Sequence, residues 1–127
     1  AMLCPQTISQ FAGVEALKNG DEDIVHMRDE YDMRRRYVID RLNKMGLPCA
    51  TPLGAFYAFP DIRSSGLSSM EFCSALLQSK KVAVIPGNAF GKAGEGYVRF
   101  SYSYSIQHIQ EALDRLEVFM SELKSKK

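Results

Sequence analysis

One arginine occupies the middle of a short segment that otherwise has the pattern of an apolar and aromatic β-strand. Residues 97–102 alternate, so that Val98, Phe100 and Tyr102 face one side of the strand and Arg99 faces the other. A guanidinium keeps its charge in proteins, and burying it without an anion is costly. Its planar fork matches a carboxylate through two parallel hydrogen bonds. Arg99 is therefore the candidate residue for carboxylate recognition.

Two kinds of carboxylate could satisfy this arginine. A ligand could supply it, or a local acid such as Asp61 or Glu95 could form a salt bridge with Arg99. The residues alone support both interpretations equally, and both stay open at this point.

Other chemistry has little support in the chain. There is no C-x-x-C pair, and His26 and His108 fall on different expected helices, so we predict no metal site. No G-x-S-x-G motif is present, and the glycine-rich loop at Gly91-Lys92 lacks P-loop spacing. We predict no catalytic residue within this chain.

Composition narrows the class of protein. The chain has 127 residues, 46% of them apolar, and a formal net charge of +1, which favours neither nucleic-acid nor membrane binding. Residues 96–100 resemble an RNA-binding strand motif, but Glu95 has the wrong charge and the spacing is off. The odd, widely spaced set Cys4, Cys49 and Cys73 is typical of reduced thiols, so we expect a cytoplasmic protein.

The elements that must position Arg99 follow from periodicity, caps and turn residues. Ser68 and Glu71 form a capping box that predicts the start of one helix. The glycine-rich residues 88–96 predict a loop, and Pro86-Gly87 is expected to end the strand before it. The expected order is helix 5–18, long helix 21–45, a strand within 54–60, helix 69–80, strand 82–85, strand 97–102 and a helix after Ser105.

This order favours one topology. A strand–helix–strand unit prefers a parallel crossover, and the loop then returns the last strand between the first two, antiparallel to both. We predict an α+β fold: a two-layer small domain with a three-stranded, mainly antiparallel sheet covered by helices and a long helix leading in. The aromatic residues of the strands are expected to be core more often than stacking platforms. The first helix carries a loose apolar face that includes Ile8, Phe11 and Leu17, which could pack on a part of a longer protein.

Four segments together resemble one family. They are GAFYAFPDI, the helix and turn ending LLQSKKVAVIPGNAFG, the strand YVRFSYS and the closing helix IQEALDRLEVFM. In order and spacing they are similar to the C-terminal small domain of class I and II aminotransferases, which are pyridoxal-phosphate enzymes of the aspartate aminotransferase fold type. The resemblance implies an interdomain helix segment at residues 1–20 and the C-terminal small domain at 21–127.

The resemblance also implies roles. The arginine of the last strand in this family binds the α-carboxylate of the substrate, and the matching residue is Arg99. The Pro86-Gly87 turn and Asn88 match the loop that borders the substrate in this family. The resemblance assigns them no specific contact with the substrate. The family's Schiff-base lysine lies before this segment. Ser121 and Lys124 form a Ser-x-x-Lys on the frayed last turn, which we reject because an exposed lysine lacks the surroundings that lower its pKa.

The resemblance implies a longer parent protein, an enzyme that transfers an amino group between an amino acid and a 2-oxo acid with pyridoxal phosphate as cofactor. This parent is expected to be a homodimer. The chain alone is expected to bind no pyridoxal phosphate and to be inactive. Aspartate, aromatic and diaminopimelate-type substrates all remain open. The alternative is a stand-alone α+β domain that binds a small molecule or regulates a partner.

Overall fold

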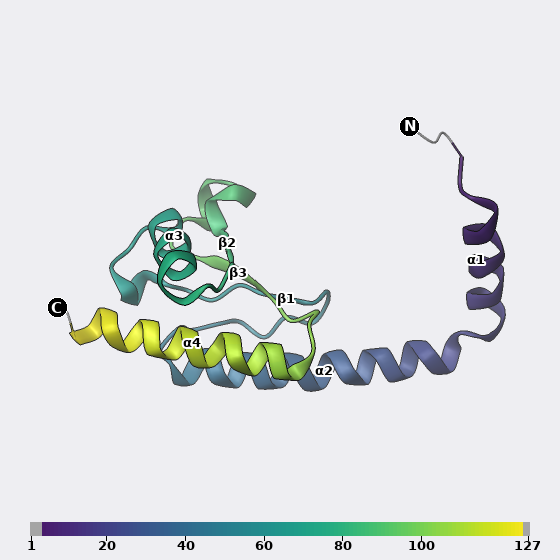
Figure 1. Cartoon of the computed structure of the whole chain (residues 1–127), viewed down its shortest axis with the longest axis horizontal. Coiled ribbons are helices and arrows are strands. Elements are labelled where there is room, and N and C mark those ends of the chain that lie inside the picture. The colour runs from purple at the N-terminus through teal and green to yellow at the C-terminus, as the bar shows by residue number, and fades with distance from the viewer. Residues whose placement is uncertain (1–3, 126–127) are drawn as a thin grey trace. The chain divides into compact units, whose positions relative to one another are not determined.

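The computed structural model describes residues 4–125, which divide into two compact units, one ending at Asp32 and the other starting at Met33. Each unit is considered by itself. The helices and strands are shown in Figure 1. In chain order they are α1 (Thr7–Asn19), α2 (Asp21–Lys44), β1 (Tyr57–Ala58), α3 (Ser69–Lys80), β2 (Ile85–Pro86), β3 (Val98–Ser101) and α4 (Ile106–Ser125).

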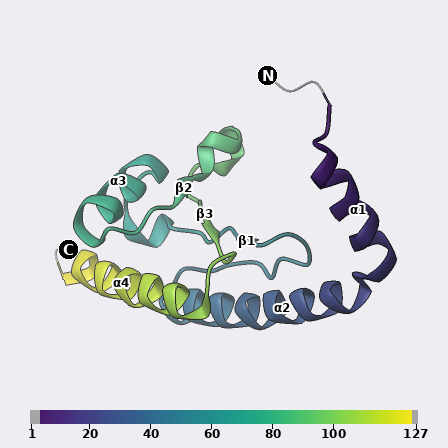
Figure 2. The same cartoon turned by 45° about the vertical axis from the view of Figure 1, so that its right-hand side comes forward.

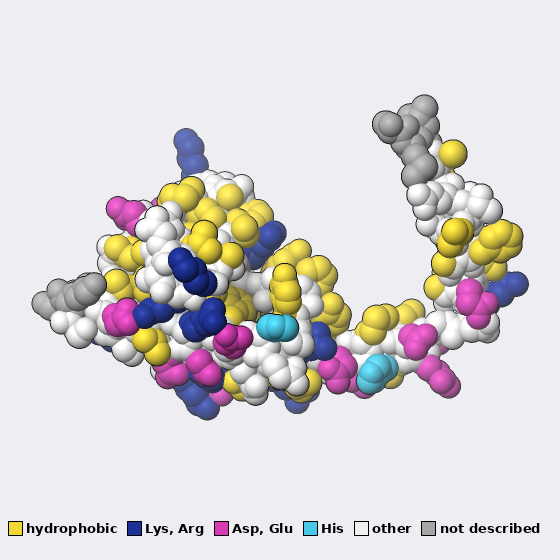
Figure 3. Space-filling model, viewed as in Figure 1, with side chains coloured by type: hydrophobic (Ala, Val, Ile, Leu, Met, Phe, Trp, Pro, Cys, Tyr) yellow, Lys and Arg dark blue, Asp and Glu magenta, His cyan; other side chains and the backbone are white. Residues whose placement is uncertain are grey.

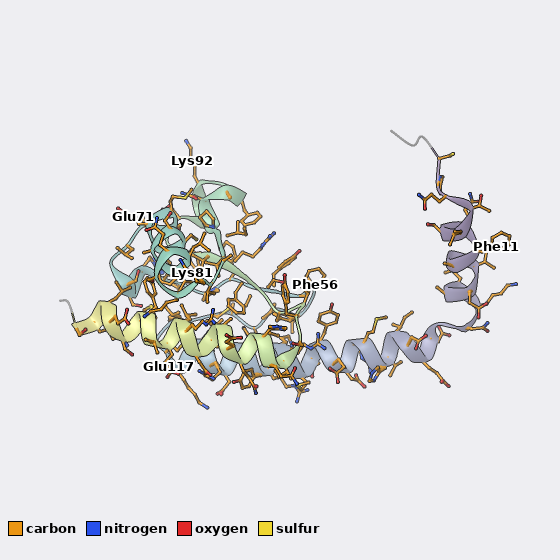
Figure 4. The ribbon with its side chains drawn as sticks, in the orientation of Figure 1. Phe11, Phe56, Glu71, Lys81, Lys92 and Glu117 are labelled. Atoms are coloured by element: carbon orange, nitrogen blue, oxygen red, sulfur yellow. The ribbon has the colours of Figure 1, made fainter. Side chains whose placement is uncertain are left out.

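The first unit holds α1 and the first turns of α2. Acidic residues open α2, where they favour the positive end of the helix dipole. No side chain of α1 is buried, and Ile8, Phe11 and Leu17 are 81%, 74% and 89% exposed. Hydrophobic side chains accordingly show along this helix in Figure 3, and Figure 4 labels Phe11. Its expected packing on a longer protein stays a prediction.

The second unit has a continuous hydrophobic core. The last turns of α2 contribute Val38 and Leu42, both fully buried. Helix α3 packs against α4, and the rings of Phe72 and Phe119 meet edge to face, with centroids 5.3 Å apart. Helix α4 runs beside the end of α2 in both ribbon views, where the Arg41 guanidinium donates to Asp114 at 2.7 Å (Figures 1 and 2). These helices fix the buried side of the sheet.

The sheet has the predicted topology. Its strand order is β1-β3-β2, and β3 is antiparallel to both neighbours. Alternate residues of β3 are buried, Val98 at 3% and Phe100 at 5% exposed, as the pattern predicted. The α+β small-domain fold is therefore confirmed.

The second strand differs from its predicted position. Residues 82–84 make no ladder, and β2 instead pairs Ile85 with Arg99 and Pro86 with Val98. The proline was expected to end the strand. It is accommodated because β2 is an edge strand, where a residue without an N–H breaks no ladder on its outer side.

Helix α3 begins at Ser69, as the capping box of Ser68 and Glu71 predicted. The Ser68 side chain accepts a hydrogen bond from the Glu71 backbone N–H, and the Glu71 carboxylate accepts one from the Ser68 backbone N–H. The Ser68 hydroxyl also donates to the Glu71 carboxylate at 2.6 Å, and this bond, together with the one from the Ser68 backbone N–H, lowers the pKa of Glu71. Helix α3 buries Phe72, Cys73 and Leu76, while Leu77 is 49% exposed.

Candidate carboxylate-binding site

Strand register brings Arg99 and two aromatic side chains to one face of the sheet. Tyr57 pairs with Ser101, and the same register continues to an isolated bridge between Asp61 and Tyr97. Because side chains alternate along a strand, Tyr57 lies on the face that carries Arg99, opposite the buried Phe100. We call this side of the sheet the arginine face.

Two aromatic rings lie close to the Arg99 guanidinium. Its Cζ lies 4.4 Å from the centroid of the Tyr57 ring and 4.7 Å from that of the Phe90 ring. Both distances fall within the range of cation–π attraction. Arg99 itself is half-buried, and Phe90 is 55% exposed. The charge is therefore held by aromatic faces at the edge of solvent.

Neither acid considered as a local partner pairs with Arg99. The Asp61 carboxylate accepts hydrogen bonds from the Arg63 backbone N–H and Nε, each at 2.9 Å, and it also pairs with Arg63 Nη2. The Arg63 guanidinium lowers the pKa of Asp61. Glu95 accepts from the Ser69 backbone N–H at 2.8 Å and from Asn88 Nδ2 at 2.7 Å. No carboxylate pairs with Arg99 among residues 4–125.

The glycine-rich loop that carries Phe90 is closed on itself. It contains two 3₁₀ turns, η2 (Gly87–Phe90) and η3 (Lys92–Gly94). The Gly87 N–H donates to the Tyr97 carbonyl at 2.8 Å, and a Cβ on Gly87 would lie 2.1 Å from the Gly94 carbonyl oxygen. Only glycine permits so close a backbone approach. The loop was predicted, but the closure that places Phe90 over Arg99 was not.

The far end of this loop is attached to α3. The buried Ser69 hydroxyl accepts a hydrogen bond from the Gly96 N–H at 2.8 Å. Glu95 bonds to both the Ser69 N–H and the Asn88 side chain. Asn88, which the family resemblance placed beside the substrate, therefore has a structural contact within its own loop.

A buried tyrosine fixes the segment before Tyr57. The Tyr102 hydroxyl donates to the Ala55 carbonyl at 3.0 Å, and its backbone N–H donates to the Phe56 carbonyl at 2.9 Å. Ala55 has φ +59°, a left-handed conformation that a non-glycine residue adopts at a cost. These bonds hold a strained turn directly before the first ring that flanks Arg99.

The aromatic residues of the sheet divide between its two faces. Phe100 and Tyr102 are core, as predicted, at 5% and 1% exposed. The prediction does not hold for Phe59 and Tyr97, whose rings stack 5.6 Å apart on the arginine face, with Phe59 38% exposed. Alternation in both strands could have revealed this face once the antiparallel register was assumed. Nothing in the sequence indicated that Phe90 would join it.

Two lysines at the end of α3 have partners of their own. Lys80 pairs with Glu122 of α4 at 2.5 Å, and the Lys81 ammonium donates to the Gln78 carbonyl at 2.9 Å. Figure 4 shows Lys92 extending outward from the η2–η3 loop.

The two histidines lie on different helices, as expected. His108 Nδ1 hydrogen-bonds with Ser105 Oγ at 2.8 Å at the start of α4, and His26 lies on α2 in the other unit. Within residues 4–125 no group of three or more His, Cys, Asp or Glu could hold a metal ion. The same residues include no helix both long and apolar enough to span a bilayer. Cys4, Cys49 and Cys73 are free thiols.

Comparison with known proteins shows the family of the chain. Residues 1–116 match the family described as aminotransferase class I and II. The chain belongs to this family. It is 50% identical over 123 residues to an aspartate aminotransferase of Pyrococcus abyssi, covering 95% of this chain and 32% of that protein. An aromatic-amino-acid aminotransferase of Thermococcus litoralis is 48% identical, with coverage of 95% and 32%.

A solved structure of an aminotransferase has the same fold. The aromatic aminotransferase from Pyrococcus horikoshii superposes with a TM-score of 0.90 and 50% sequence identity, over 95% of this chain and 33% of that one. This chain therefore spans about a third of the length of the aminotransferases it matches.

Proposed function

We propose that this chain is the C-terminal small domain of a pyridoxal-phosphate-dependent aminotransferase and that Arg99 binds the α-carboxylate of its substrate. The reaction moves an amino group between an amino acid and a 2-oxo acid. The observation that carries the proposal is a half-buried guanidinium, in contact with two rings, with no protein carboxylate paired to it in residues 4–125. A substrate carboxylate would supply the missing anion.

The work of this chain in the reaction is to bind and orient. Pyridoxal phosphate, when bound, supplies the electron sink that makes the bonds at the substrate α-carbon labile. The residues that hold it, including the lysine, belong to the part of the protein that this chain does not cover. Arg99 would fix one end of the substrate so that its α-carbon has a defined position, which is how orientation lowers a barrier. Small-domain movement would let Arg99 link substrate binding to closure of the site.

The amino-acid specificity of the enzyme depends on residues other than Arg99. Aspartate and aromatic aminotransferases are similar to this chain to nearly the same degree. All amino-acid substrates share the α-carboxylate, so an arginine that binds it is common to both specificities. We propose a homodimeric parent in the cytoplasm and no nucleic-acid partner.

A pair of matched substitutions in the full-length protein tests the proposal. Arg99→Gln removes the fork and keeps a polar side chain, while Arg115→Gln removes an exposed arginine of α4 that pairs with Glu111. Two charge-assisted bonds contribute about 3–4 kcal/mol together, so kcat/KM should fall roughly 100- to 1000-fold for Arg99→Gln. Arg115→Gln should leave kcat/KM within about twofold, since surface pairs contribute little.

A second readout separates this role from loss of cofactor. The visible absorbance of bound pyridoxal phosphate should be the same in Arg99→Gln and in the unsubstituted protein, because Arg99 does not hold the cofactor. An Arg99→Gln protein with full cofactor and undiminished kcat/KM would contradict the proposed role. Turnover by this 127-residue chain alone, with added pyridoxal phosphate, would contradict the assignment of the lysine to another part of the protein.

A further inference from the structure

Three residues between α3 and β2 have the composition of a strand but no strand partner. Residues 82–85 are apolar and mostly β-branched, which favours a strand, and Lys81, labelled in Figure 4, comes directly before them. Only the last of them joins the ladder, where Ile85 pairs with Arg99. The backbone groups of residues 82–84 make no hydrogen bond within the described range 4–125. We call residues 82–84 the open segment.

Burial along the open segment alternates as it does in a strand. Val82 is 7% exposed and Val84 is half-buried, whereas Ala83 is exposed and Ile85 is 40% exposed. Side chains of a strand point to its two faces in turn, so this is the pattern of a strand with one face on a core. The open segment therefore packs as a strand, and its backbone lacks a neighbour.

The outer edge of β2 directs backbone groups away from β3. The Gly87 N–H donates to the Tyr97 carbonyl at 2.8 Å. In an antiparallel pair the backbone groups of every second residue face the partner strand. Those of Ile85 therefore face β3, and those of Val84 face outward. Because the strand order is β1-β3-β2, no described strand lies beyond that edge.

A cavity of about 310 Å³ opens where the open segment leaves β3. Its apolar lining comes from the open segment, from β3 and from α4, and consists of Val82, Ala83, Phe100, Ile109 and Ala112. The remaining lining residues are polar or charged. Burying apolar surface is favourable, so an aliphatic side chain that entered this cavity would be stabilised there. An unpaired backbone edge and an apolar cavity thus lie side by side.

We propose that an extended segment of the parent protein, outside these 127 residues, adds to the sheet along the open segment and places an apolar side chain in the cavity. In such strand addition, main-chain hydrogen bonds give affinity and pockets for alternate side chains give specificity. The inference rests on the proposal that this chain is one part of a longer aminotransferase. It goes further by naming the surface through which another part of that protein completes the sheet.

The parent is the source of this segment that the observations favour. The chain spans about a third of the length of the aminotransferases that it matches, so most of the parent lies outside it. A segment of the same polypeptide binds intramolecularly, at an effective concentration that a free second copy does not reach in dilute solution. A bare apolar edge also promotes aggregation, which proteins prevent by covering or pairing it.

Amide hydrogen exchange compares the open segment in this chain and in the full-length protein. In the 127-residue chain the Val84 amide should exchange at close to the rate of an unstructured peptide, because no acceptor holds it. In the full-length protein it should exchange more slowly by about 100-fold or more, as a bonded amide does. The Gly87 amide is the matched control, since it donates to Tyr97 in this chain and should be protected in both proteins. Equal exchange of the Val84 amide in the two proteins would overturn the proposal.

Substitution of exposed alanines gives a second measurement. Ala83→Lys puts a charge beside the cavity, and Ala93→Lys on η3 is the matched control. In this chain alone neither should shift the midpoint of thermal unfolding by more than about 3 °C, because both side chains are exposed. In the full-length protein Ala83→Lys should raise the Val84 exchange rate about tenfold or more, since an unpaired charge would be covered. If Ala83→Lys left that rate as low as Ala93→Lys does, strand addition at this edge would be excluded.

The outcomes separate this inference from its rivals. Protection of the Val84 amide in this chain alone that increases with protein concentration would assign the edge to a second copy and overturn the choice of a parent segment. An unprotected Val84 amide in a full-length protein whose Arg99→Gln variant has lost activity would overturn this inference alone. A full-length protein that protects Val84 but has no aminotransferase activity would overturn the proposed function and leave the strand addition standing.

Discussion

The closest backbone approach beside the proposed site makes Gly87→Ala an informative substitution. A Cβ at this position would lie 2.1 Å from the Gly94 carbonyl oxygen and 2.7 Å from the Tyr97 carbonyl oxygen. Ordinary contacts of a Cβ begin at 3.4 Å, so the backbone must move by roughly 1 Å at two points. The neighbours are main-chain atoms, which cannot rotate away as a side chain could.

The expected cost follows from these contacts. Overpacking of a close-packed site costs about 1–3 kcal/mol. Displacing the loop also weakens the hydrogen bond from the Gly87 N–H to the Tyr97 carbonyl, now 2.8 Å, which contributes about 1 kcal/mol. The free energy of unfolding should therefore fall by about 2–4 kcal/mol. Phe90 lies at the end of the same turn, so its contact with Arg99 should weaken as well.

Urea unfolding followed by near-ultraviolet circular dichroism of the tyrosines measures this cost. Gly54→Ala is the matched control, because its Cβ would meet no atom within 4 Å, and its stability should change by less than about 0.5 kcal/mol. Gly94→Ala brings the same clash from the opposite side, with its Cβ 2.1 Å from the Gly87 carbonyl oxygen. If Gly87→Ala and Gly94→Ala were both as stable as Gly54→Ala, the closed-loop geometry would be wrong.

Three further predictions concern stability. Ser68→Ala removes the cap of α3 and should cost about 1 kcal/mol in urea unfolding, whereas Ser79→Ala, near the exposed end of that helix, should cost less than half as much. Burial raises the pKa of the Cys73 thiol from 9.0 to about 11, so the folded protein holds this proton more tightly than the unfolded chain does. The free energy of unfolding should therefore fall as the pH rises from about 9 to 11. A Cys73→Ala variant should lose that pH dependence. A double-mutant cycle of Arg41→Gln and Asp114→Asn should give a coupling of about 0.5–1 kcal/mol that shrinks in high salt; no coupling at low salt would mean that this bridge does not contribute.

Much of the fold could be predicted because it depends on local signals. The capping box at Ser68 and Glu71 predicted the start of α3 correctly, and the alternation around Arg99 predicted which side of β3 is buried. The order of the strands followed from the length of the loop before β3 and from preferred strand connections. These features depend on few residues that are close in sequence.

The structure differs from the predictions where residues far apart in the sequence determine the local geometry. Pro86 alone predicts the end of a strand, yet the edge position of β2 allows it inside the ladder. The same limit applies at the site. The need of Arg99 for an anion was readable from its strand, but the ring of Phe90 reaches it only because Gly87 and Gly94 approach each other. A contact that depends on loop closure leaves no pattern of spacing in the sequence.

The central claim is that Arg99 receives the substrate carboxylate, and the most direct test is a crystal structure of the full-length protein with a bound 2-oxo acid. We predict two carboxylate oxygens at about 2.7–2.9 Å from the nitrogens of Arg99, in the plane of the guanidinium. A carboxylate held by another residue, with Arg99 still lacking an anion, would contradict the claim.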